Sequence, residues 1–315
     1  MPAYTATAPG KIILVGEHAV VYGQPALAVP VRDVRARAVV RADIKGEEGA
    51  IRIFAPGIGL QSRYKDLPVN HPLRVAVDGV LHELELLRTP ACSLHIHSTI
   101  PIASGLGSSA AVSAAVIQAL AGFLGHPLSK ERVSSLVFEV EKIHHGTPSG
   151  IDNTVVTYDK PVFFTKGLPI QTFSIGKPFT FVIGDTGIPS ATAETVGLVR
   201  NAYQEDKQRF EDLFSAIGSL AIKARTAIIA GRKADLGAVM DENHTLLKEM
   251  GVSSPELDRL VEGARKNAAW GAKLSGGGGG GNMIALVESE QAEQMAQTLK
   301  DIGAANTIIT RIEPT

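Results

Sequence analysis

The sequence comprises 315 residues, and its 31 lysine and arginine residues balance 32 acidic residues to a formal net charge of -1. This balance argues against bulk attraction to nucleic acid or to an acidic membrane surface as the main activity. Hydrophobic residues make up 44% of the chain, but no apolar run approaches the roughly 20 residues of a bilayer span. No secretory leader is visible, and a single cysteine excludes intramolecular disulfides. We therefore expect a cytoplasmic protein without nucleic-acid or membrane partners.

The first half of the chain is expected to contain strands and then helices. Apolar and polar residues alternate along residues 34–44 with the period of a strand, whereas residues 73–88 place leucine and valine at helical spacing. The patterns predict strands at 27–31, 34–44, 51–54 and 93–100, helices at 73–88, 108–124 and 129–145, and a short strand pair near 154–164.

The second half is expected to be mainly helical before a final group of strands. Residues 190–268 are helical in pattern, with breaks at Gly231 and Gly251. Strands are expected at 179–185, before the glycine run, at 283–288 and at 306–312, with a helix at 289–302. Runs of strands and runs of helices without regular alternation favour an α+β fold over a doubly wound parallel sheet. The stretch 165–178 is the expected boundary between two lobes, 1–172 and 173–315.

The glycines are unevenly distributed. Of 32 glycines, 14 lie in four short segments, at residues 9–23, 101–111, 141–154 and 271–282. Glycine is needed where the backbone adopts positive φ or approaches another group closely. These segments are therefore the candidates for a ligand site.

The segment PIASGLGSSAA at 101–111 lies between a predicted strand and a predicted helix. Gly105 and Gly107 allow close backbone approach, Ser108 or Ser109 can cap the helix, and the first-turn N–H groups favour an anion such as phosphate. An ordinary glycine turn with a serine cap explains the segment equally well. The spacing matches neither the Walker A nor the Rossmann pattern.

Glycines 276–281 form an uninterrupted run that is typical of a flexible linker. Apolar residues on both sides favour instead a loop embedded in one lobe, against which a flat or charged group could lie. Lys11, at the edge of an apolar strand, is either a strand-edge charge or a cation that neutralises a transferring phosphoryl group.

Two carboxylates, Glu141 and Asp152, flank a turn of Gly, Pro and Ser. Together they could hold a divalent cation and accept a proton, as phosphoryl transfer requires, although either could be a solvated surface charge. The adjacent His144 and His145 point in different directions on a helix, which favours a structural or surface role over metal binding.

These segments together resemble the GHMP kinase superfamily, which has a proline-lysine segment near the N-terminus, a PxxxGLGSSAA loop and a C-terminal glycine-rich loop. All three occur here in that order, between Pro9 and about Asn282. Within the superfamily, GEHAVVYG at 16–23 and HGTPSGIDNTV at 145–155 resemble the mevalonate kinase family. The resemblance implies two lobes: an N-terminal lobe like domain 2 of ribosomal protein S5, and a C-terminal ferredoxin-like lobe with additional helices.

The resemblance also implies a role for each matching residue. Asp152 is expected to be the catalytic base, with Lys11 beside it near the γ-phosphate, and Ser109 and Glu141 are expected to hold Mg2+. ATP-binding positions are Lys11, Ala103, Ser104, Gly105, Leu106, Gly107, Ser108 and Ser109, with Gly276, Gly277, Gly278 and Gly279 in the glycine-rich loop. Substrate-binding positions are Glu17, His18, Ser149, Asp152 and Thr192.

The implied activity is transfer of the ATP γ-phosphoryl group to the 5-hydroxyl of (R)-mevalonate by a homodimer. The sequence departs from the family pattern in KLSGGGGGG, where many members have KLTGAGGGG, and at Ser190, where animal members carry a basic residue. The alternatives are a kinase of the same superfamily acting on phosphomevalonate, homoserine or a sugar, a mevalonate 3-kinase or diphosphate decarboxylase, and a catalytically silent metabolite sensor.

Overall fold

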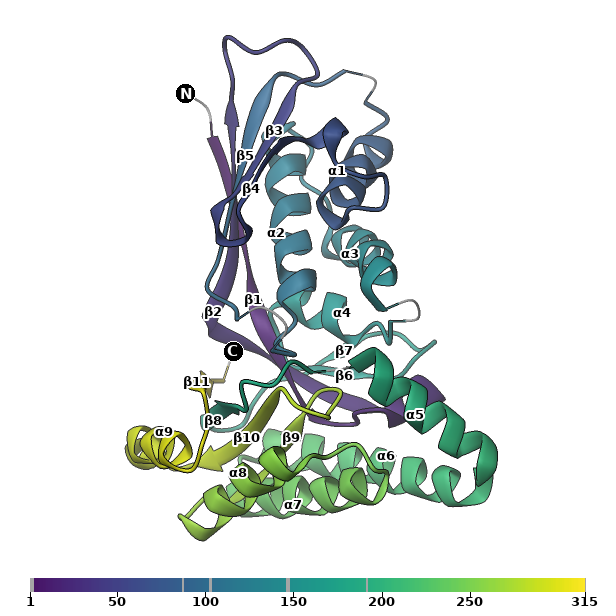
Figure 1. The fold of residues 1–315 in the computed structure, drawn as a ribbon, viewed down its shortest axis with the longest axis vertical. Coiled ribbons are helices and arrows are strands. Elements are labelled where there is room, and N and C mark those ends of the chain that lie inside the picture. Colours follow the sequence, from purple (N-terminus) through teal and green to yellow (C-terminus); the bar gives the residue numbers. More distant parts are fainter. Residues whose placement is uncertain (1–2, 87, 102–103, 146–147, 191, 315) are drawn as a thin grey trace. The chain divides into compact units, whose positions relative to one another are not determined.

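The structure is a computed structural model that describes residues 3–86, 88–101, 104–145, 148–190 and 192–314 (Figure 1). The chain divides into two compact units. Unit 1 comprises Met1–Gly10, Val34–Pro101 and Gly107–Asp159, and unit 2 comprises Lys11–Asp33, Ile102–Leu106 and Lys160–Thr315. The expected boundary between residues 172 and 173 stays a prediction.

The strands of unit 1 form one layer. Strand β2 (Ala26–Ala42) enters the unit at Val34 and pairs antiparallel with β5, with Ala36 opposite Ser98 and Ala42 opposite Cys92. Strand β3 pairs parallel with β5 and antiparallel with β4. The other strands of this unit are β1 (Ala3–Val15, through Gly10), β3 (Ile51–Ala55), β4 (Leu60–Arg63) and β5 (Cys92–Ser98). Buried and less buried residues alternate along β2 from Val34, which confirms the predicted strand.

Helices lie on one side of these strands (Figure 1). Helix α2 contacts β5, and α1, α2 and α3 contact one another. The helices of unit 1 are α1 (Pro72–Glu83), α2 (Ser108–Phe123), α3 (Lys130–His145) and α4 (Ile151–Tyr158), with 3-10 turns η2 (Pro56–Ile58) and η3 (Tyr64–Asp66). Alanines dominate the buried residues of α2, which allows close packing against its neighbours.

The strand pair predicted near 154–164 is wrong in its first part. Residues Ile151–Tyr158 form helix α4, and only Val162–Phe164 form a strand, β6. The run of β-branched residues favours a strand by propensity, but the Thr154 hydroxyl donates to the Gly150 carbonyl at 2.7 Å and the apolar side chains are buried where α4 contacts α2 and α3. Tertiary packing thus overrides local propensity here.

Unit 2 contains a four-stranded antiparallel sheet. Its strands are β8 (Phe179–Asp185), β9 (Gly271–Ser275), β10 (Asn282–Val287) and β11 (Asn306–Ile312). Their order is β11-β8-β10-β9. With a helix between the last two strands in sequence and helices between the first two, this order is that of a ferredoxin-like lobe. The predicted α+β class and the ferredoxin-like lobe are confirmed.

The helices of unit 2 are α5 (Thr192–Glu205), α6 (Lys207–Ala230), α7 (Lys233–Glu249), α8 (Pro255–Lys266) and α9 (Ala292–Asp301), with 3-10 turns η1 (Ala19–Tyr22) and η4 (Ser289–Gln291). The first half of β2 pairs with β6, which pairs with β7 (Gln171–Thr172). The predicted breaks are confirmed, because Gly231 caps α6 and Gly251 follows the last turn of α7.

Among the described helices, only α6 is long and apolar enough to cross a membrane by length and composition. Half of its apolar stretch, 50%, is buried inside the fold, and the helix contacts α7 and η1. A core helix has the same length and composition as such a segment. The buried residues of α6 and its contacts with α7 and η1 place it against the core of unit 2.

Candidate active site

The expected phosphate loop enters helix α2 in unit 1. Gly107 is the N-cap residue, with a φ of 72°, and no side chain of the described residues caps the helix. The serine cap suggested by the sequence is therefore wrong, because the helix begins at Ser108 itself. Ser108 and Ser109 are both half-buried in the first turn, where the N–H groups have no helical partner. The loop thus retains the arrangement that binds an anion.

Both expected carboxylates lie on helices that contact each other in unit 1. Glu141 on α3 is buried, and Asp152 is half-buried in the first turn of α4. The next residue, Asn153, donates from Nδ2 to the carbonyl of Ser134 at 3.1 Å and to its hydroxyl at 2.9 Å. This pair of bonds fixes the start of α4 against α3. Ser149 accepts from the N–H of Ile151 at 3.4 Å, so its hydroxyl also supports the helix start.

Lys11 and the first part of the phosphate loop belong to unit 2. The side chain of Lys11 is buried, and its backbone N–H donates to the Leu106 carbonyl at 2.9 Å. The carbonyl of Ser104 accepts a hydrogen bond from Asn282, the first residue of β10. These contacts join residues 104–106 to β1 and to the end of the glycine run. Ala103 lies outside the described residues.

The glycine-rich loop is enclosed by the protein itself. A Cβ at Gly278 would lie 1.9 Å from the carbonyl oxygen of Val252, and one at Gly277 would lie 2.7 Å from the hydroxyl of Thr192. The N–H of Gly279 donates to the Val252 carbonyl at 2.9 Å. The loop is therefore embedded in unit 2, as the flanking residues predicted. Thr192 lies against this loop, so the structure brings one expected substrate-binding residue next to the expected glycine-rich loop.

Ser190 precedes helix α5 and contacts the glycine-rich loop. Its hydroxyl is 3.1 Å from that of Thr192 and donates to the Gly278 carbonyl at 3.4 Å. The position that is basic in animal members of the family therefore carries a side chain that bonds to the protein here.

His18 and Glu17 are both buried in the turn before η1. The Nε2 of His18 lies 2.9 Å from the carbonyl oxygen of Gly277. Because a carbonyl only accepts, this nitrogen carries the proton. Burial lowers the pKa of His18 below its usual 6.5, while the bond to Gly277 and the charge of Glu17 oppose the shift. His18 is thus uncharged at neutral pH.

Sequence reasoning missed two residues that contact Glu17. Lys273 on β9 donates to Oε1 of Glu17 in a salt bridge, and Asn243 on α7 donates to Oε2 at 3.1 Å. The exposed fractions of the Lys273 and Glu17 side chains are 0% and 1%. Burial lowers the pKa of Lys273, and Glu17 opposes that shift. The one available signal was a lysine inside the apolar strand that precedes the glycine run.

The sequence and the fold both match known proteins. The model of the GHMP kinase N-terminal domain matches residues 70–160, and that of the C-terminal domain matches residues 224–305. A mevalonate kinase of Pyrococcus abyssi is 38% identical over 331 aligned positions, which cover 98% of this chain and 95% of the relative. The chain belongs to the mevalonate kinase family of the GHMP kinases.

Two crystal structures of mevalonate kinases match the whole fold. That of the L. major enzyme in complex with R-mevalonate has a TM-score of 0.84 and 28% identity, covering 99% of this chain and 96% of the other. That of the Methanococcus jannaschii enzyme has a TM-score of 0.84 and 27% identity, covering 100% and 99%. The family resemblance of the sequence is therefore confirmed. The roles of individual residues stay predictions.

Proposed function

We propose that this protein transfers the γ-phosphoryl group of ATP to the 5-hydroxyl of (R)-mevalonate, giving 5-phosphomevalonate and ADP. The observation that carries this proposal is the match to mevalonate kinases over nearly the whole chain, both in sequence and in fold. The chain also retains a cation and a base of the right types, because Lys11 and Asp152 stand at the positions of the family motifs.

In the proposed reaction, Asp152 accepts the proton of the 5-hydroxyl as the hydroxyl oxygen forms its bond to the γ-phosphorus. The bond from that phosphorus to the bridging oxygen breaks, and ADP leaves. Lys11 neutralises negative charge on the phosphoryl group during its transfer. Because such transition states are loose, positioning and charge neutralisation contribute most of the rate enhancement. The bonds of Asn153 to Ser134 support this role by fixing the turn that carries Asp152.

The first turn of α2 and the glycine-rich loop are proposed to bind the phosphates of ATP through backbone N–H groups. We further propose that Ser109 and Glu141 hold Mg2+. Their hydroxyl and carboxylate oxygens suit this ion, which commonly takes one or two protein oxygens together with substrate phosphates. Among the described residues, no group of three or more His, Cys, Asp or Glu side chains is placed to hold a metal ion. The bound ion would neutralise charge on the phosphate oxygens.

A coupled ADP-release assay tests the activity. Purified protein is incubated with Mg2+, ATP and, in turn, mevalonate, phosphomevalonate, homoserine and galactose, and two-dimensional 31P–1H NMR identifies the phosphorylated carbon. We expect release with mevalonate and phosphate on C5. ADP release with another alcohol only would indicate a different kinase of the superfamily. Phosphate on C3 would indicate a mevalonate 3-kinase, and ATP binding without turnover would indicate a catalytically silent sensor.

Asp152→Asn tests the base. We expect kcat to fall by about 10²- to 10⁴-fold, the usual contribution of a positioned base, while ATP affinity changes little. Asp159→Asn is the matched control, because Asp159 caps the same helix and its carboxylate forms a half-exposed salt bridge with Arg35 at 3.5 Å. Near-normal turnover of Asp152→Asn would remove Asp152 from the mechanism.

A homodimer and a cytoplasmic location also stay predictions. Sedimentation equilibrium of the purified chain measures the first, and fractionation of cells that produce the protein measures the second.

A further inference from the structure

A buried ion pair lies next to the expected substrate residue His18. Both oxygens of Glu17 are occupied, one by Lys273 and the other by Asn243, and Lys273 also donates to the Leu274 carbonyl. All three side chains are buried, with Asn243 at 0% exposed. Both carboxylate oxygens therefore bond to the protein, and the side chain is only 1% exposed to solvent.

Stability alone does not explain such a pair. Desolvating two charges costs about as much as their attraction returns, and apolar replacements of similar volume are often neutral or stabilising. What the pair does fix is geometry. It ties the turn that contains Glu17 to strand β9, which leads directly into the glycine-rich loop, and to helix α7.

The turn so fixed is strained at its next residue. His18 has a φ of 59°, in the left-handed region that non-glycine residues rarely adopt. Strain of this kind persists only where the surroundings enforce it. Here the enforcing contacts are the Glu17 pair on one side and the bond from His18 Nε2 to the Gly277 carbonyl on the other. The Ala19 N–H closes the turn on the Glu17 carbonyl at 2.6 Å.

We infer that Glu17, Lys273 and Asn243 are positioning residues for the phosphoryl transfer, which hold His18 in its productive conformation and join it to the glycine-rich loop. Glu17 then acts on the acceptor substrate through His18 and makes no contact with it, in contrast to the substrate-binding role that the family resemblance implied. This inference rests on the proposed function.

A double-mutant cycle separates the two roles of Glu17. Glu17→Gln and Lys273→Met are each made in the wild-type chain and in a His18→Asn background, and kcat/KM for mevalonate is measured. We expect each single variant to lose about 10-fold or more in the wild-type background and less than about 2-fold in the His18→Asn background, because residues that act through one group are not additive. Equal losses in both backgrounds would overturn the inference.

The KM for ATP provides a second readout. The glycine-rich loop keeps its own bonds to Val252 and Ile188, so we expect the KM for ATP to change by less than about 3-fold in both variants. Thr310→Val is the control for general destabilisation of unit 2. The Thr310 side chain is buried and its hydroxyl donates to Asp33 at 2.6 Å, a bond that involves neither His18 nor the partners of Glu17. A loss of mevalonate kcat/KM in Thr310→Val as large as in Lys273→Met would indicate a merely structural effect and overturn the inference.

NMR of the His18 imidazole keeps the inference testable without turnover. A two-bond 1H–15N correlation reports the protonated Nε2 directly. We expect this signal to move in Lys273→Met and to remain in place in Thr310→Val. If Lys273→Met does not fold, Asn243→Ala removes the Oε2 bond alone and takes its place in the cycle and in the NMR experiment. An unmoved His18 signal overturns the positioning role, whereas a wild-type protein inactive on mevalonate overturns only the proposed function.

Discussion

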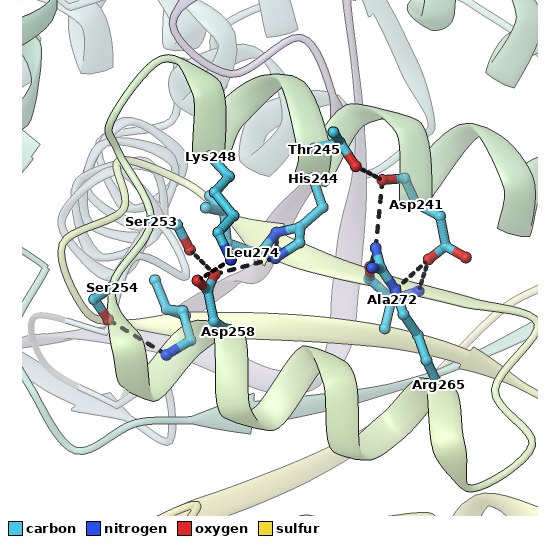
Figure 2. Close-up of polar contacts among 11 residues, drawn as sticks. Asp241, His244, Thr245, Lys248, Ser253, Ser254, Asp258, Arg265, Ala272 and Leu274 are labelled. Atoms are coloured by element: carbon cyan, nitrogen blue, oxygen red, sulfur yellow. Dashed lines mark hydrogen bonds and ion pairs between the residues drawn. The ribbon is translucent and has the colours of Figure 1, made fainter.

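Replacing His244 tests how burial controls protonation inside unit 2. Figure 2 shows His244 between strand β9 and helix α8: Nδ1 accepts from the Leu274 N–H at 3.3 Å, and Nε2 lies 3.3 Å from Oδ1 of Asp258. Asp258 also accepts from Ser253 at 2.6 Å and pairs with Lys248 at 2.7 Å. The side chain of His244 is therefore a neutral link between α7, α8 and β9.

The pKa of His244 is lowered to about 4, first by burial and then by the charges of Arg265 and Lys273, with Asp258 opposing them. In the unfolded chain the same group titrates near 6.5. Between these two values the unfolded state binds more protons, so the free energy of unfolding falls as pH falls. By pH 4.5 this single group removes about 2.5 kcal/mol of the stability present at pH 7.

The single tryptophan, Trp270, lies in unit 2 and precedes β9, so its fluorescence reports unfolding of this unit. Urea unfolding is followed at pH 7, 6, 5 and 4.5 for the wild type and for His244→Asn, whose amide oxygen can still accept from Leu274. His18, whose pKa is also lowered, titrates in both proteins and cancels in the difference. We expect the free energy of unfolding of the wild type to fall toward that of the variant progressively below pH 6.5. If the difference in free energy of unfolding between the two proteins stayed constant from pH 7 to 4.5, the lowered pKa of His244 would be refuted.

Two further substitutions test the loop and the helix that carry the proposed site. Gly278→Ala is expected to lower the melting temperature and weaken ATP binding, because its Cβ would meet the Val252 carbonyl at 1.9 Å and its positive φ alone costs about 1–2 kcal/mol. Gly276→Ala is the control, because no described atom lies within 4 Å of a Cβ there and the substitution carries only the cost of the positive φ. If both variants lowered the melting temperature equally, the clash with Val252 would have no effect. Asn153→Asp replaces the two donors to Ser134 and is expected to cost about 1–3 kcal/mol and to lower kcat for mevalonate. Unchanged kcat would show that these bonds do not position the neighbouring aspartate.

Hydrophobic periodicity predicted most of the fold because most of its elements are long or half-buried. Helices α6 and α7 end where Gly231 and Gly251 interrupt the pattern, and β8, β10 and β11 match their predicted ranges closely. Helix α4 was mistaken for a strand because a short segment with buried valines and threonines carries no periodicity that distinguishes the two structures. The packing of α4 against α2 and α3 decides the matter, and it is not visible in the local sequence.

The site was less predictable than the fold because sequence motifs name residues without their contacts. The segment that contains Glu17 was recognised, but the partners of Glu17 lie 256 and 226 positions away, on β9 and α7. Nothing in the spacing of Lys273 or Asn243 links them to the first segment. The family resemblance assigned Glu17 to the substrate, whereas its burial and its occupied oxygens favour an indirect role.

The glycine-rich loop illustrates how a motif can combine two physical causes. Gly277 and Gly278 lack a Cβ because Thr192 and Val252 occupy that space, so these two positions fix the loop before any ligand arrives. At Gly276 and Gly105, by contrast, no described atom lies within 4 Å of a Cβ. Preorganised backbone dipoles stabilise charge without reorganisation at the moment of reaction. Under the proposed function, a chain of nearly neutral charge can therefore bind a polyanionic nucleotide, because the enclosed glycines fix the shape of the loop while the open positions Gly276 and Gly105 leave backbone accessible to the phosphates.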